Sequence, residues 1–91
     1  MIAVWKFVLD TLDENIIQIP LCPRILSVGV QYGKICVWAM VETESSLENH
    51  KFLVFGTGHN ARDAEYSRFI GTVFLDGGGL VFHVFDGGIV V

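Results

Sequence analysis

The segment from Gly56 to Arg62 has the residue types and spacing best suited to chemistry in this chain. It consists of Gly56, Thr57, Gly58, His59, Asn60, Ala61 and Arg62. Its two glycines allow backbone N–H groups to converge on an anion, and the arginine adds a positive charge. A helix that begins near Asn60 would direct its amino terminus to the same place. We therefore predict an anion or small-ligand site here; the alternative is a glycine-rich bend in which Thr57 and Asn60 cap a helix.

An aromatic side chain follows this segment closely. Tyr66 is four residues beyond Arg62, and an exposed aromatic ring beside an anion site can stack a nucleobase while the site holds its phosphate. The alternative is a helix residue that packs on the sheet. The predicted ligand-binding residues are Gly56, Thr57, Gly58, His59, Asn60, Arg62 and Tyr66.

The remaining chemically capable side chains show no arrangement typical of a reactive site. The histidines and cysteines are His50, His59, His83, Cys22 and Cys36. They have no ligand spacing such as CxxC or HxxxH, so we expect neither a metal nor another cofactor. No nucleophile with a base and an orienting acid can be identified, so we do not expect an enzyme.

The two cysteines also bear on the cellular compartment. They lie fourteen residues apart in a chain without a recognisable secretion signal. This pattern predicts two free, buried thiols in a reducing cytoplasm.

Length and composition limit the architecture to a single domain over residues 1–91. Apolar residues make up 52% of the chain and charged residues only 18%, against a usual charged share of about 25%. A small monomer has too few charges here to cover its surface, which predicts a homo-oligomer, either a dimer or a tetramer. The net charge of −4 argues against binding to duplex nucleic acid. No apolar run approaches the roughly 18 residues that cross a bilayer, so no membrane association is expected.

A two-residue apolar periodicity dominates the chain and predicts an all-β fold. The expected strands are residues 4–9, 16–19, 25–31, 35–41, 51–55, 69–75 and 80–85. At most one short helix is expected, of about two turns from Asn60 through Tyr66, with Asp63 at the capping spacing. Residues 87–91 form either a frayed tail or a tail that docks on a neighbour. Seven short strands joined by regular turns indicate a small antiparallel sandwich or a partly closed barrel.

Two of the expected strands, 35–41 and 80–85, are apolar on both faces. A sheet with one solvated face alternates apolar and polar residues instead. Because few helical residues remain to cover a second face, we expect another subunit to cover it.

Five segments resemble a family of small proteins encoded by bacteriophages and prophages. They are 25–31 (ILSVGVQ), 38–41 (WAMV), 56–59 (GTGH), 69–72 (FIGT) and 80–85 (LVFHVF). The resemblance extends from about residue 5 to residue 86, and GTGH and LVFHVF together are its most specific part. Asn60-Ala61 departs from the Pro-containing continuation of that pattern, so the resemblance does not fix what this loop binds.

In size, β-rich pattern and expected assembly, the chain is also similar to the anti-CBASS sponge proteins of phages. That resemblance implies a tetramer that sequesters a cyclic nucleotide immune signal in the host cytoplasm and so blocks antiviral signalling without catalysis. The alternatives are a protein-interaction module and a small structural component of the phage particle, neither of which needs a small-molecule ligand.

Overall fold

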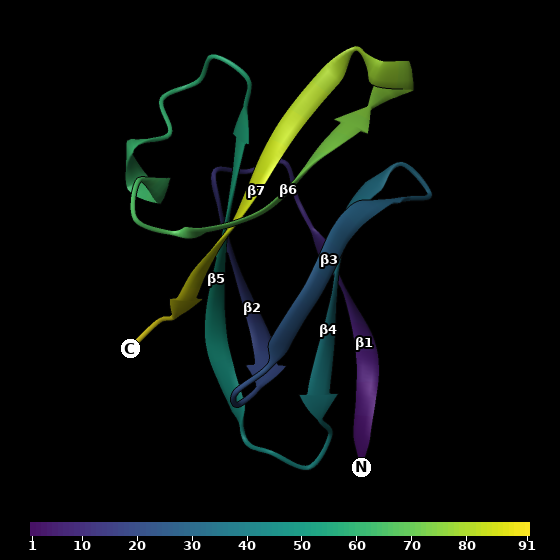
Figure 1. Cartoon of the computed structure of the whole chain (residues 1–91), viewed down its shortest axis with the longest axis vertical. Helices are drawn as coiled ribbons and strands as arrows, with labels where there is room; N and C mark the ends of the chain where they lie inside the picture. The colour runs from purple at the N-terminus through teal and green to yellow at the C-terminus, as the bar shows by residue number, and fades with distance from the viewer.

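Seven β-strands arranged in two antiparallel sheets form the protein (Figure 1). The structure is a computed structural model that describes all 91 residues. The strands are β1 (Ile2–Leu9), β2 (Glu14–Pro20), β3 (Arg24–Gln31), β4 (Lys34–Glu42), β5 (Leu47–Gly56), β6 (Arg68–Leu75) and β7 (Leu80–Ile89). The predicted all-β fold of seven strands is confirmed.

The two sheets face each other as a sandwich. One has the strand order β1-β4-β3 and the other the order β2-β5-β7-β6. At one side β3 lies against β6, so closely that a Cβ atom on Gly71 would come within 2.7 Å of Val28 Cγ1. At the other side β1 and β2 end their sheets, so the sandwich is confirmed and the structure is not a closed barrel.

Glycine-containing turns set the register of both tight hairpins. Tyr32 and Gly33 have φ values of 52° and 73°, the combination of a two-residue turn that matches the twist of the strands it joins. This turn joins β3 to β4, as predicted. The predicted closing hairpin is also confirmed, with a 3₁₀ turn over Asp76–Gly78 between β6 and β7.

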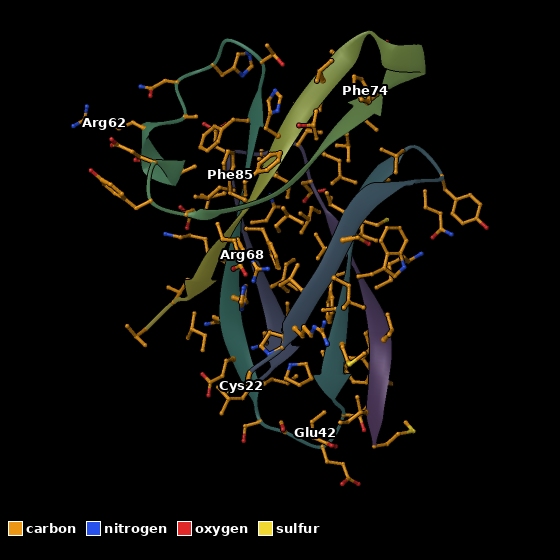
Figure 2. The ribbon with its side chains drawn as sticks, in the orientation of Figure 1. Cys22, Glu42, Arg62, Arg68, Phe74 and Phe85 are labelled. Carbon is orange, nitrogen blue, oxygen red and sulfur yellow. The ribbon has the colours of Figure 1, made fainter.

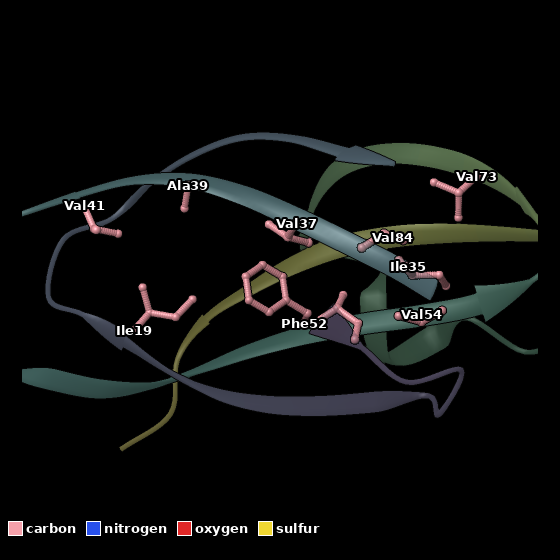
Figure 3. Close-up of a cluster of buried hydrophobic side chains, with 10 residues drawn as sticks. Ile19, Ile35, Val37, Ala39, Val41, Phe52, Val54, Val73 and Val84 are labelled. Carbon is pink, nitrogen blue, oxygen red and sulfur yellow. The ribbon is translucent and has the colours of Figure 1, made fainter. Parts of the chain in front are cut away.

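The hydrophobic core fills the space between the two sheets (Figure 3). Along β4, alternate residues point into it, and β2, β5, β6 and β7 contribute from the opposite side. The fully enclosed members are Ile19, Ile35, Val37, Ala39, Val41, Phe52, Val54 and Val84. Residues two apart in β4 thus share the buried face, although the sequence of this strand is apolar on both faces and does not itself identify that face.

Neither alternative expected for 87–91, a frayed tail or a tail that docks on a neighbour, describes residues 87–89. The last strand continues to Ile89, which lies opposite His50 on β5, and the Val90 N–H donates to the Asn49 carbonyl at 2.8 Å. The register of this pairing shifts between Lys51 and Phe52, and Gly88 beside the shift has a φ of 80°. The tail thus completes the chain's own sheet.

The expected two-turn helix is also wrong. A single 3₁₀ turn spans Arg62–Ala64, and its N-cap is Ala61, without a side-chain cap. Asn60 instead accepts the Arg62 N–H through its Oδ1 at 3.0 Å, a local turn that competes with helix formation. With two 3₁₀ turns of three residues each, the structure has no helix long and apolar enough to cross a membrane.

The second apolar face of the larger sheet is covered in part by the chain itself. Leu53 and Phe55 on the outer face of β5 are buried, and they pack with Ala64 and Ala61 from the segment between β5 and β6. At β5, an irregular segment of the same chain thus covers the outer face of the sheet as a helix would. Cover by another subunit, expected for the strands 35–41 and 80–85, stays a prediction.

The two cysteines are free, as predicted, but only Cys36 is buried; Cys22 is exposed in the turn after β2. Protein prepared without reductant is expected to show one thiol that reacts rapidly with a thiol reagent in the native state. A second thiol, that of Cys36, should react only after denaturation. A count of zero thiols after denaturation, at an unchanged monomer mass, would contradict this expectation.

Candidate functional site

A cavity of about 230 Å³ lies where β5 ends and β7 begins. On one side it is lined by Gly56, Thr57 and His59, which belong to the predicted ligand-binding segment. On the other side it is lined by Gly79, Leu80, Val81 and Phe82, which sequence reasoning did not assign to a site. The cavity therefore combines a polar wall with a mostly apolar one, the composition usual for small-molecule sites.

His59 forms the polar wall by folding back on the end of β5. Its backbone N–H donates to the Gly56 carbonyl at 3.0 Å. A Cβ atom on Gly56 would lie 2.9 Å from the imidazole ring, so only glycine permits this approach. Gly58, between them, has a φ of 87°, which a side chain would strain. Both glycines of the segment thus serve to place the histidine ring at the cavity.

Thr57 is held in place by a histidine of β7. The Thr57 hydroxyl lies 2.7 Å from His83 Nε2, and the Thr72 hydroxyl lies 2.9 Å from Nδ1 of the same ring. A ring bonded at both nitrogens has its orientation fixed, whichever tautomer is present. His83 therefore acts on the cavity indirectly, by positioning the Thr57 side chain at its edge.

Part of this arrangement could have been found from the sequence. The hairpin around Asp76 and Gly79 pairs Leu75 with Leu80, and counting back from the turn places Thr72 opposite His83. The contact from Thr57 could not be found in that way, because it depends on how β5 pairs with β7.

The other predicted site residues do not line the cavity. Arg62 and Tyr66 do not line it, and both side chains are exposed, that of Tyr66 almost completely. Figure 2 shows Arg62 pointing away from both sheets. Asn60 and Gly58 are likewise outside the lining. The structure thus brings together three of the seven predicted residues and separates the stacking ring and the positive charge from them.

Three of the backbone N–H groups of the segment are engaged within the chain. Those of Thr57, His59 and Arg62 donate to Val81 O, Gly56 O and Asn60 Oδ1. The cavity lining contains neither Lys nor Arg. Its chemistry is therefore that of a hydroxyl, an imidazole and an apolar floor, which can orient a neutral ring better than a multiply charged phosphate.

A second polar group lies inside the sandwich and was missed in the sequence. His50 Nε2 lies 2.6 Å from Asp86 Oδ1, and both side chains are largely buried. Burial acts to raise the pKa of the Asp86 carboxyl. The hydrogen bonds from His50 and from the Gly88 N–H, together with the charge of Arg68, outweigh this effect and hold the pKa below its usual value.

This pair lies beside a smaller cavity of about 70 Å³, where β3 approaches β6 and β7. The cavity is lined by Ile25, Leu26, Arg68, Phe69, Ile70 and Asp86. No cluster of three or more His, Cys, Asp or Glu side chains that could hold a metal ion is present in the structure. His50 and Asp86 form a pair rather than a larger set of ligands.

Comparison with known proteins gives one match. Neither the curated proteins nor the solved structures contain a match to the chain. A family model described as a domain of unknown function, DUF7352, matches residues 1–88, which include every strand except the last residue of β7. The chain therefore belongs to the DUF7352 family.

Proposed function

We propose that this protein binds and sequesters a small nucleotide-type ligand without transforming it. The single observation that carries the proposal is the cavity between Gly56–His59 and the start of β7. Its volume of about 230 Å³ is below the roughly 300–1,000 Å³ of sites that enclose a drug-sized molecule. It suits one ring of a larger ligand, such as one base of a cyclic dinucleotide.

The lining residues support a base as the occupant. The His59 imidazole offers a surface for stacking, and the Thr57 hydroxyl offers a hydrogen bond to a ring nitrogen or an exocyclic group. The phosphates of such a ligand would remain outside the cavity, where Arg62 is the nearest arginine in sequence. In the biological setting implied by the phage resemblance, the ligand is a cyclic nucleotide immune signal in the host cytoplasm.

Self-association belongs to the same proposal. Only 17 of the 91 residues are buried, and exposed large apolar side chains occur on both sheets. A homo-oligomer, a dimer or a tetramer, would remove much of this apolar surface from water. It would also bring two or more cavities into one particle, which suits a ligand with two bases.

The test is a thermal-melt series with cyclic and linear mono- and dinucleotides, combined with a search for nucleotide absorbance in the purified protein. A ligand at a hundred times its Kd should stabilise the fold by about 2.7 kcal/mol. We expect Thr57→Val, which replaces the hydroxyl with a methyl group of similar size, to weaken binding by roughly tenfold. Tyr66→Ala, at an exposed position outside the cavity, should bind as the parent does.

Three results would count against the proposal, each in a different way. If no nucleotide shifts the melt and none is carried through purification, the sequestering function is wrong. If Arg62→Ala abolishes binding while Thr57→Val leaves it intact, the site lies on the exposed side of the loop and not in the cavity. If the recovered ligand is chemically altered, the protein is an enzyme.

A protein-interaction module is the second candidate, and exposed aromatic residues on β6 favour it. Phe69 and Phe74 lie on the outer face of this strand and are 54% and 61% exposed. Phe69 is in edge contact with Phe85 at 5.4 Å between ring centroids. If the nucleotide series fails, this surface becomes the leading binding site, for a host protein or for a component of the phage particle.

A further inference from the structure

The first strand forms a free edge that is unusually apolar. β1 pairs with β4 on one side only, and Figure 1 shows no element beyond its other side. Four of its eight residues are exposed large apolar side chains, namely Ile2, Val4, Trp5 and Val8. Its pairing with β4 is regular along its whole length, without a bulge. Long, regular, apolar edges of this kind readily pair with another strand.

The hydrogen bonds to β4 show which residues present their backbone to the free edge. The Thr43 N–H donates to the Met1 carbonyl at 2.9 Å, and the register continues without a break from there. Hydrogen-bonded and non-hydrogen-bonded pairs alternate in an antiparallel ladder. The residues whose N–H and C=O groups point away from β4 are therefore Ile2, Val4, Lys6 and Val8.

The outward backbone groups of these four residues can pair with those of the same four residues in a second, antiparallel copy. If Val4 lies opposite Lys6 of the second copy, then Ile2 lies opposite its Val8, and all four outward backbone positions are paired. Trp5 then lies opposite its own copy, on the two-fold axis. A shift of two residues in one direction leaves Val8 unpaired. The same shift in the other direction leaves Ile2 unpaired and places Lys6 against itself.

The one charge on this strand is held away from the edge. An edge lysine commonly prevents strand pairing, but here Lys6 Nζ donates to Gln31 Oε1 on β3 at 2.7 Å. The ammonium group therefore extends across the outer face of the sheet. β2, the free edge of the other sheet, carries Glu14 and ends in Pro20, which has no N–H to donate.

We propose that two copies of this chain associate through antiparallel pairing of β1, which joins their three-stranded sheets into one sheet of about six strands. The inference rests on the self-association that is part of the proposed function, and it gives that association a surface and a register. It does not depend on the identity of the ligand.

The register can be tested with a matched pair of charges at one exposed position. In the proposed pairing, residue 4 of each copy lies opposite Lys6 of the other. Val4→Lys therefore creates two equivalent lysine–lysine pairs, whereas Val4→Glu creates two equivalent glutamate–lysine pairs. Directly opposed like charges destabilise a strand pair and opposite charges stabilise it. We expect the Kd of the dimer, measured by sedimentation equilibrium, to be at least about fivefold higher for Val4→Lys than for Val4→Glu. Phe74→Lys and Phe74→Glu, on the exposed face of β6, should show no such difference.

A disulfide provides a second measurement that does not depend on charge. Trp5→Cys, in a Cys22→Ser background, places two thiols at a non-hydrogen-bonded pair, where the Cα atoms lie close enough for a bridge. A covalent dimer should form on oxidation, whereas Ile2→Cys in the same background should give none, because residue 2 lies opposite Val8 of the second copy and, within the chain, opposite Glu42. Circular dichroism and a thermal melt of each variant confirm that it remains folded.

The outcomes separate this inference from the proposed function. A parent protein that stays monomeric at all concentrations would overturn both the β1 interface and the proposed self-association. A dimer that is equally stable in Val4→Lys and Val4→Glu, and that gives no disulfide through Trp5→Cys, would overturn the interface alone. Loss of nucleotide binding in the melt series would leave the interface unaffected.

Discussion

Phe52→Ala is expected to lower the free energy of unfolding by about 3–5 kcal/mol, because it removes a large, fully enclosed ring from the centre of the sandwich. Small domains are stable by only roughly 5–15 kcal/mol, so the change removes a large share of the total. For a domain of this size the corresponding fall in Tm exceeds about 12 °C. Urea unfolding followed by circular dichroism measures the change.

The matched control is Phe74→Ala, which removes the same ring from an exposed position on β6. Its effect should be below about 1 kcal/mol, because a ring that is largely in water in both states contributes little on folding. If the two variants were equally destabilised, the core between the sheets would not be where the structure places it.

The sequence predicts the strands that build this core, because their residue types and turns are local signals. Residues two apart in a strand share a face, but 35–41 is apolar on both faces, so the pattern around Val37 and Ala39 indicates the strand and not its buried side. The turns are equally local: Tyr32-Gly33 and the Asp76–Gly79 segment act on the chain directly around them. The number of strands and the two tight hairpins could therefore be predicted from these short-range signals.

What the sequence does not predict depends on contacts between distant segments. The polar spacing after Gly56 is compatible with a capped helix, but Ala64 packs against Leu53 and Phe55 on the outer face of β5. Tertiary contacts of this kind override weak local preferences. In the same way, the end of the chain looks frayed because it is rich in glycine, whereas its pairing with His50 and Lys51 places it in the sheet.

The candidate site shows the same division. The glycine-rich segment marks the cavity because glycines permit the close approach of His59 to Gly56. Arg62 and Tyr66 are near that segment in sequence but lie outside the cavity, since a 3₁₀ turn and not a helix follows it. The opposite wall comes from the start of β7, about twenty residues further along the chain, and no local pattern connects the two.

The His50–Asp86 pair is the clearest case of a group that only the folded chain creates. Its partners are 36 residues apart, and His50 lies within a strand whose core residues are apolar. The His50 and Phe52 rings lie 4.9 Å apart, and Phe52 is opposite Asp86 in the strand register. Substitutions at these positions should therefore not be additive, because the residues share neighbours.

Asp86→Asn is expected to destabilise the protein at pH 7 by about 1.5–3 kcal/mol, because it removes the charge that accepts hydrogen bonds from His50 and the Gly88 N–H. The pKa of Asp86 is lower in the folded state than its usual value. The carboxylate therefore contributes its full stabilisation above the usual pKa, near pH 4, and this contribution is lost as the pH falls through the lower folded value. When unfolding is measured between pH 7 and pH 2, the free energy of unfolding should fall more steeply with decreasing pH for the parent than for Asp86→Asn.

Asp63→Asn provides the comparison for this pH series, because Asp63 is exposed on the 3₁₀ turn. Asp63→Asn should leave the free energy of unfolding at pH 7 unchanged within about 0.5 kcal/mol. Its free energy of unfolding should also fall with decreasing pH as steeply as that of the parent. If the stability of Asp86→Asn and that of Asp63→Asn fell equally steeply with decreasing pH, the charge of Asp86 would contribute nothing to stability through its pair with His50. A difference in slope confined to the region below about pH 4 would instead assign that part of the acid sensitivity to the Asp86 carboxylate.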